Sequence, residues 1–137
     1  MKPAASTLFA AGASLAAMAA IATGLVLVGP PGQARLQRLD QQRLQALQTL
    51  SNAIGAYHHA HGALPGSLGQ LAQAQGGLSG PQMRDPATGQ AYEYRPAGPA
   101  AYQLCARFAA VSDAEAEIRW RHPVGRACFS FTPARDG

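Results

Sequence analysis

The chain has 137 residues, a formal net charge of +4 and a hydrophobic fraction of 47%. Once the apolar first thirty residues or so are set aside, this length leaves room for one small globular domain. The basic residues are almost all arginine and are scattered along the chain with acidic residues among them, so they form no continuous stripe that could follow a phosphate backbone. We therefore expect no nucleic-acid partner.

The N-terminal segment is apolar enough to cross a membrane. After a short leader, residues 1–3, the run Ala4–Gly29 carries no charged residue, and its length of about 26 residues exceeds the roughly 20 that a helical span needs. We predict a retained transmembrane anchor over 4–29. A cleaved signal peptide is the alternative, although its apolar core is normally only about 7–15 residues long.

Two signals disagree about the side of the membrane on which the rest of the chain lies. Arg35, Arg38 and Arg43 follow the span and only Lys2 precedes it, which favours a cytoplasmic domain by the positive-inside rule. Two cysteines in a small domain and a very short leader favour export. We predict export: a single-pass inner-membrane protein with its C-terminal domain, residues 35–137, on the periplasmic side.

A long amphipathic helix should follow a Gly/Pro linker over residues 30–34. Pro30 and Pro31 donate no backbone hydrogen bond, so they separate this helix from the membrane span. The helix should end at Gly62, because glycine suits the left-handed conformation of a C-cap.

The apolar residues of this helix recur mostly three or four apart and form one stripe. They are Leu36, Leu39, Leu47, Leu50, Ile54 and Tyr57. A coiled-coil dimer could cover such a stripe, but Arg43 and Tyr57 lie on or near the seam that it would use. We therefore expect the rest of the chain to pack on the stripe.

The rest of the chain predicts a short helix and then strands. Ser67 is a suitable N-cap for a helix that runs to about Gln75, and Asp85 to Gly89 predict a tight turn. Side chains then alternate as in strands in four segments. These segments are 91–95, 101–108, 118–122 and 126–131. The expected class is α+β, with the long helix as a spine packed on a small antiparallel sheet.

Cys105 falls in the second proposed strand and Cys128 in the fourth. Two cysteines in a small exported domain are most simply a disulfide between neighbouring strands. The alternative is a reactive cysteine paired with a histidine such as His122, but no local signature of a cysteine hydrolase surrounds either thiol. We predict the disulfide.

Histidines and carboxylates suggest metal sites only weakly. The cluster His58, His59 and His61 closes the long helix, where histidine also suits the helix dipole, and no nearby Cys, Asp or Glu completes a ligand set. The alternating acids Asp113–Glu117 lack EF-hand spacing. Because no catalytic motif is present, we expect no catalytic residue, metal, cofactor or small-molecule substrate. A small metal-binding or enzymatic module that uses the histidine cluster is an alternative.

The order of these features resembles the globular part of type IV pilin-like proteins, especially the major pseudopilins of type II secretion. Those proteins carry a turn of the form D-P-x-G-x-x-Y-x-Y that leads into a small antiparallel sheet. The matching segments here are Ala53–Tyr57, His61–Pro65 and Asp85–Tyr94, the last with one extra residue before its glycine. The resemblance covers roughly Leu39 to Phe108 and implies a helical spine packed on a sheet.

The chain departs from pilins in the features that govern filament assembly. Pilins carry a glutamate near the start of their mature hydrophobic segment, and Ala4–Gly29 has no acidic residue. Pilins also continue the membrane helix into the globular helix, whereas Pro30 and Pro31 interrupt it here. We therefore expect a membrane-anchored, non-enzymatic domain with an interaction or envelope-structural role, whose partners are other envelope or secretion proteins. A divergent pseudopilin is the alternative.

Overall fold

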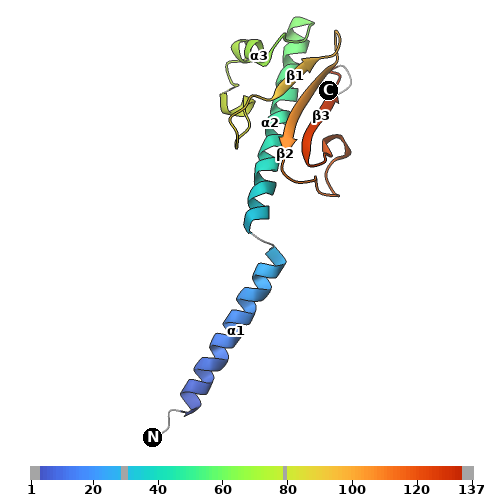
Figure 1. Cartoon of the computed structure of the whole chain (residues 1–137). Coiled ribbons are helices and arrows are strands. Elements are labelled where there is room, and N and C mark those ends of the chain that lie inside the picture. The colour runs from blue at the N-terminus through green and yellow to red at the C-terminus, as the bar shows by residue number, and fades with distance from the viewer. Residues whose placement is uncertain (1–3, 29–30, 79, 134–137) are drawn as a thin grey trace. The chain divides into compact units, whose positions relative to one another are not determined.

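In a computed structural model, the chain is described over residues 4–28, 31–78 and 80–133 (Figure 1). It divides into two units, Met1–Arg35 and Leu36–Gly137. The elements are α1 (Ala4–Val28), α2 (Pro31–His61), α3 (Leu68–Ala74), the 3₁₀ helix η1 (Gly80–Met83), β1 (Glu93–Pro96), β2 (Tyr102–Phe108), the 3₁₀ helix η2 (Ile118–Trp120) and β3 (Gly125–Phe131). The predicted leader, the last residue of the predicted anchor, Gly29, and the first residue of the predicted linker, Pro30, lie outside the described residues.

α1 has the length and composition of a membrane-spanning helix. It contains 25 residues, none of them charged, and at about 1.5 Å per residue it is long enough to span the hydrocarbon core of a bilayer. Its large side chains are exposed, and Phe9 exposes 82% of its surface. The described part of the chain contains one such candidate segment, and it lies near the N-terminus.

α2 begins at Pro31, earlier than the predicted start near residue 35. Proline is well placed there, because the first turn of a helix leaves its N–H groups unpaired in any case and the fixed φ of proline suits the helix. α2 ends as predicted. Gly62 has φ 68°, and its N–H donates to the carbonyl of His58 at 2.8 Å. α3 also starts as predicted, since the Ser67 hydroxyl accepts from the Gln70 amide.

Alanine in place of two glycines, one inside α2 and one just after it, should change the free energy of unfolding in opposite directions. Gly55 lies inside α2, and a Cβ there would meet nothing within 4 Å, so Gly55→Ala should raise the free energy of unfolding by about 0.5–1 kcal/mol. Gly62→Ala should lower it by about 1 kcal/mol, because alanine resists the left-handed conformation. Urea denaturation followed by the fluorescence of Trp120 measures both. Changes of the same sign would contradict this account.

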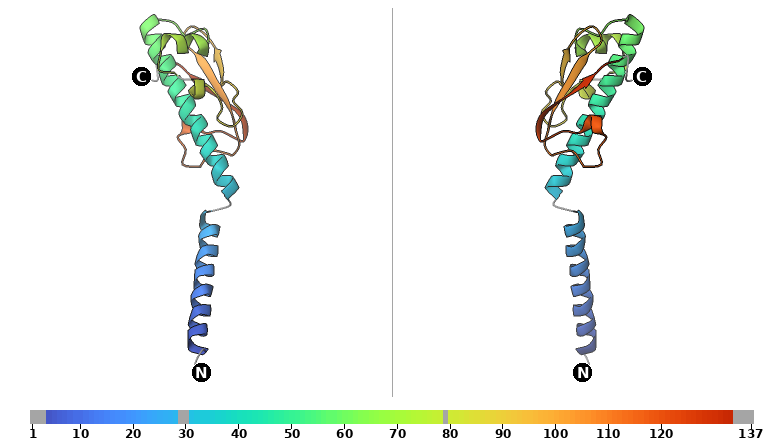
Figure 2. Two further views of the ribbon diagram at one scale, coloured as in Figure 1. Left: turned by 90° about the vertical axis from the view of Figure 1, so that its left-hand side faces the viewer. Right: turned by 90° about the vertical axis from the view of Figure 1, so that its right-hand side faces the viewer.

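In the described part of the chain the sheet has three antiparallel strands in the order β1-β2-β3, and α2 runs along its inner face (Figures 1 and 2). The register pairs Tyr102 with Phe131 and Leu104 with Phe129, and these inward side chains pack on Leu47, Leu50 and Ile54 of α2. The expected α+β class and the packing of the stripe on the sheet are confirmed. Leu36, at the start of the stripe, is 43% exposed, so the covered part begins further along α2.

The predicted strand over 118–122 is wrong, because this segment forms η2 instead. The Trp120 amide donates to the Glu117 carbonyl at 2.9 Å, which closes a turn. The turn leaves Ile118 81% exposed and carries the Trp120 ring onto Phe129 and Phe131, at centroid distances of 5.0 and 5.4 Å. The alternating pattern of residues 118–122 therefore does not mark a fourth strand. It includes a tryptophan that is buried at the edge of the core.

Candidate functional site

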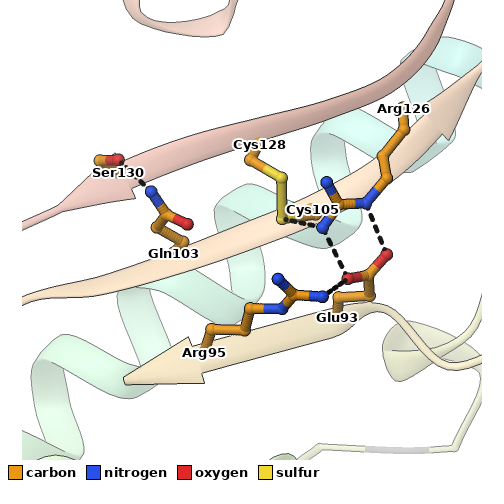
Figure 3. The surroundings of a disulfide bond; sticks show 7 residues. All are labelled: Glu93, Arg95, Gln103, Cys105, Arg126, Cys128 and Ser130. Carbon is orange, nitrogen blue, oxygen red and sulfur yellow. Dashed lines mark hydrogen bonds and ion pairs between the residues drawn. A yellow bond between two sulfur atoms is a disulfide. The ribbon is translucent and has the colours of Figure 1, made fainter. Parts of the chain in front are cut away.

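The outer face of the sheet, turned away from α2, carries polar side chains. Alternation in β1, β2 and β3 places a set of eight residues on this face. They are Glu93, Arg95, Gln103, Cys105, Arg107, Arg126, Cys128 and Ser130, and Figure 3 shows all of them except Arg107. We call this surface the outer sheet face.

Cys105 and Cys128 form the predicted disulfide. They are direct cross-strand partners in β2 and β3, with Cα atoms 4.0 Å apart (Figure 3). Cys105 is buried and Cys128 is exposed. The bond therefore joins the two longest strands at the middle of their pairing, and it fixes the register that sets which side chains reach the outer sheet face.

Glu93 joins two arginines of the outer sheet face. Arg126 donates to its carboxylate through both Nε, at 2.9 Å, and Nη2, at 2.8 Å, and Arg95 donates through Nη2 at 2.9 Å (Figure 3). This fork is the strong geometry for an arginine and a carboxylate. The hydrogen bond from Arg126 is the main reason that the pKa of Glu93 is lowered to about 2. Arg126 also donates from Nη2 to Cys105 Sγ at 3.5 Å.

The pKa of Glu93 should therefore measure about 2, and Arg126→Gln should raise it more than Arg95→Gln does. Because the folded pKa lies below the ordinary value of 4.5, the stability that this carboxylate contributes is full above that pH and is lost as the pH falls toward 2. A carbon NMR titration of the side-chain carboxyl measures the value. An unchanged Glu93 pKa in Arg126→Gln would contradict the assignment.

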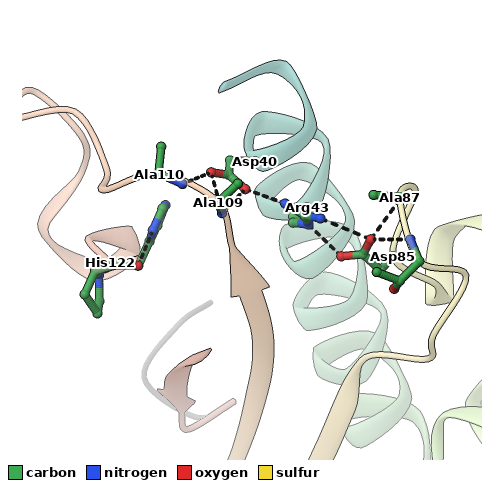
Figure 4. Close-up of polar contacts among 9 residues, drawn as sticks. Asp40, Arg43, Asp85, Ala87, Ala109, Ala110 and His122 are labelled. Atoms are coloured by element: carbon green, nitrogen blue, oxygen red, sulfur yellow. Dashed lines mark hydrogen bonds and ion pairs between the residues drawn. The ribbon is translucent and has the colours of Figure 1, made fainter. Parts of the chain in front are cut away.

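A second polar centre is buried between α2 and the loops that flank the sheet. Arg43 donates from Nε to Asp85 Oδ2 and from Nη1 to Asp40 Oδ1, both at 2.6 Å (Figure 4). All three residues are buried, with exposed fractions of 5 to 8%. We call Asp40, Arg43 and Asp85 the buried ion cluster.

Each carboxylate of the buried ion cluster also fixes a loop. Asp40 accepts from the amides of Ala109, at 3.0 Å, and Ala110, at 2.8 Å, just after β2 ends (Figure 4). Asp85 accepts from the amides of Ala87 and Thr88 at 2.8 and 2.9 Å. The cluster thus holds both the turn before β1 and the chain after β2 against α2. These contacts position the sheet on α2.

Tyr92 lies beside the buried ion cluster and is 6% exposed. Burial, with a smaller contribution from the charge of Asp85, raises the pKa of its hydroxyl to about 12. Among the described residues this hydroxyl has no hydrogen-bond partner. At neutral pH it is therefore a neutral core group and not a proton acceptor.

The histidines of the described chain do not form a set of metal ligands. His61 stacks on Tyr57 with ring centroids 4.0 Å apart, and the rings of His58 and His59 lie edge to face with centroids 6.5 Å apart. The buried His122 ring stacks on the Phe108 ring with centroids 3.6 Å apart, and His122 lines the same cavity as Asp40. Positions 40 and 58 of α2 are roughly 27 Å apart at about 1.5 Å per residue, so His122 is remote from the cluster.

The alternating acids Asp113, Glu115 and Glu117 lie in an exposed turn. The Ala116 amide donates to the Asp113 carbonyl, and Arg121 donates to the carbonyls of Ala114 and Ala116. Among the described residues, no group of three or more His, Cys, Asp or Glu side chains is arranged to hold a metal ion. The turn therefore presents its negative charge to solvent.

Sequence reasoning missed the buried ion cluster. One signal was present, because Asp40 and Arg43 are spaced like the apolar residues of the stripe and so share its face. Their partner Asp85 lies 42 residues beyond Arg43, and spacing along the chain does not reveal that contact. Comparison of the chain with protein-family models, with curated proteins and with solved structures gave no match.

Proposed function

We propose that this chain is a single-pass membrane protein whose domain, residues 35–137, is exported and serves a non-enzymatic interaction or envelope-structural role. The observation that carries the proposal is the pairing of an uncharged helix of 25 residues with a disulfide-bonded domain. The helix is long enough to cross a bilayer, and disulfides persist in oxidising compartments. An inner-membrane anchor with a periplasmic domain satisfies both conditions.

The polar groups of the domain support a role in binding rather than catalysis. The buried ion cluster uses its hydrogen bonds to hold loops, and Glu93 uses its carboxylate to hold Arg95 and Arg126. A catalytic acid or base needs a titratable group that faces a substrate and has a pKa near the working pH. The exposed sheet presents instead a fixed, charged surface of the kind that recognises another protein.

Photo-crosslinking in intact cells tests this role. A photoreactive residue in place of Arg107 reports on the outer sheet face, and one in place of Gln48, an exposed position of α2, reports on the opposite side of the domain. We expect a specific envelope protein to be crosslinked from at least one position. Full-length protein that gives no specific adduct from either position would contradict an interaction role.

A divergent pseudopilin is the second candidate. The observation that favours it is the turn at Asp85, where Gly89 has φ 70° and its amide donates to the Asp85 carbonyl at 2.8 Å, before the chain enters β1. This turn and the helix packed on the sheet match what the pilin-like resemblance implies. A pseudopilin should be trimmed by a prepilin peptidase. An intact N-terminus in protein isolated from cells would favour the solitary anchored domain.

A further inference from the structure

We propose that the Cys105–Cys128 bond is a site of thiol–disulfide exchange, at which an exposed thiolate of another protein attacks Cys128 and Cys105 is the leaving group. This inference goes beyond the proposed function and rests on the surroundings of the bond, whichever protein the domain binds. The two sulfur atoms lie in different surroundings, and this difference assigns their roles.

The two cysteines differ in their access to solvent. Cys105 is 1% exposed, whereas Cys128 is exposed. The sheet order explains the difference, because Cys105 lies on the central strand β2 and Cys128 lies on β3, beyond which no further strand pairs in the described part of the chain. Access decides which sulfur of a disulfide is attacked. An incoming thiolate therefore reaches Cys128 more easily.

Side chains of the outer sheet face cover Cys105. Glu93 of β1 is the cross-strand partner of Cys105, and Arg126 reaches across β2 to bind its carboxylate. Figure 3 shows the Arg126 guanidinium and the Glu93 carboxylate next to Cys105. A thiolate attacks along the line of the S–S bond, and for Cys105 this approach comes from the side of β1. Arg126 and Glu93 therefore hinder attack on Cys105.

Arg126 is placed to stabilise Cys105 as the leaving group. Its Nη2 donates to Cys105 Sγ at 3.5 Å, and among the described residues no side chain donates to Cys128 Sγ. The sulfur of a disulfide is a weak acceptor, but a thiolate carries a full negative charge, so this hydrogen bond strengthens when the S–S bond breaks. Arg95 and Arg126 share the single carboxylate of Glu93, which leaves a net positive charge beside Cys105. A thiol with a lowered pKa leaves faster.

The exchange has two steps. In the first, the attacking thiolate forms a bond to Cys128 Sγ as the bond to Cys105 breaks, and Cys105 leaves with the electron pair as a thiolate. The partner is then joined covalently to β3. In the second, another thiolate of the partner attacks the partner's own sulfur in this mixed disulfide and releases Cys128 as a thiolate. The partner's dithiol is thereby oxidised, the bond of this chain is reduced, and the released thiolates take up the protons that the partner's thiols gave to water.

The test uses the full chain in detergent micelles and reduced glutathione, a monothiol, as the probe. The reaction is quenched with acid, and mass spectrometry of tryptic peptides measures the glutathione adduct on each cysteine. Trypsin cleaves after Arg107 and Arg126 and so places the two cysteines on different peptides. In the folded chain the adduct on Cys128 should exceed that on Cys105 by about tenfold or more, and in the chain unfolded in urea the two should be similar.

Substitutions of the arginines test the role of Arg126. Arg126→Gln should slow formation of the Cys128 adduct by about threefold to tenfold and should weaken the preference for Cys128, because Cys105 loses both its donor and its cover. Arg126→Lys keeps the positive charge and should keep most of the rate. Arg107→Gln is the matched control and should react like the unaltered chain. Arg107 lies two residues from Cys105 on the same face of β2, and it has no hydrogen bond to Cys105 in the described part of the chain.

Equal adducts on the two cysteines of the folded chain, or more adduct on Cys105, would overturn the proposal, and this comparison stays decisive if Arg126→Gln does not fold. A folded chain that forms no adduct while the unfolded chain does would also overturn it, since the bond would then be closed to thiols. Equal rates for Arg126→Gln and Arg107→Gln would do the same, because the choice of leaving group rests on Arg126. A domain found in the cytoplasm would contradict the proposed function and leave this inference standing.

Discussion

Replacing Arg43 by methionine is expected to lower the free energy of unfolding by about 3–5 kcal/mol, the range for breaking a buried ion pair by removing one partner. The substitution keeps an unbranched apolar stem but leaves Asp40 and Asp85 buried without their cation. This loss is a large part of the stability of a domain of this size, which is typically about 5–15 kcal/mol. Denaturation followed by Trp120 fluorescence reports on the folded domain, because this single tryptophan is buried there.

A triple variant separates the loss of a partner from the loss of packing. Asp40→Asn, Arg43→Met and Asp85→Asn together remove every charge of the buried ion cluster, while the asparagine oxygens can still accept from the loop amides. Replacement of a whole buried pair is often close to neutral, so the triple variant should be more stable than Arg43→Met alone. A loss below about 1 kcal/mol in Arg43→Met, or a triple variant less stable than the single one, would contradict the structural role.

The same cluster predicts a pH dependence. Burial raises the pKa of Asp85, but the hydrogen bonds from Arg43 and from the amides of Ala87 and Thr88 outweigh it, so the folded pKa lies below the ordinary value. The stability that Asp85 contributes is therefore full above that ordinary value and is lost as the pH falls through the folded pKa. The stability of Arg43→Met should fall less over this pH range than that of the unaltered chain, because Asp85 has lost Arg43, its main stabilising partner.

Removing the disulfide is expected to have the second large effect. Cys105→Ala with Cys128→Ala opens a loop closed across 23 residues, and the expected loss is about 3 kcal/mol. Reduction of the unaltered chain with dithiothreitol should produce a similar loss and should leave the double variant unchanged. Reaction of both thiols with a maleimide in exported, denatured, non-reduced protein would show that the bond is absent in the cell.

Local rules predicted the ends and turns of the fold. Gly62 ends α2, Ser67 caps α3 and Asp85 organises the turn before β1, because each depends on residues a few positions away. The disulfide was predicted from the number of cysteines and their place in strands. Such features can be predicted from contacts between residues that are close in the sequence or, for the disulfide, from the single pairing that two cysteines allow.

The missed features depend on contacts that are distant in the sequence. The alternation around Trp120 suggested a strand, but the segment forms a 3₁₀ helix that places the indole against Phe129 and Phe131. Leu36 looked like part of the covered stripe, yet α2 is covered only from about Asp40 onward. Among the described residues the sheet therefore has three strands rather than the four that the sequence predicted.

Protease treatment of intact spheroplasts, followed by detection of an epitope tag at the C-terminus, tests the central claim of a tethered exported domain most directly. If the domain is exported, an added protease should remove the tag without detergent while a cytoplasmic marker survives. The tagged protein should also remain in the membrane fraction before proteolysis. A tag that is cut only after detergent opens the membrane would place the domain in the cytoplasm and contradict the account.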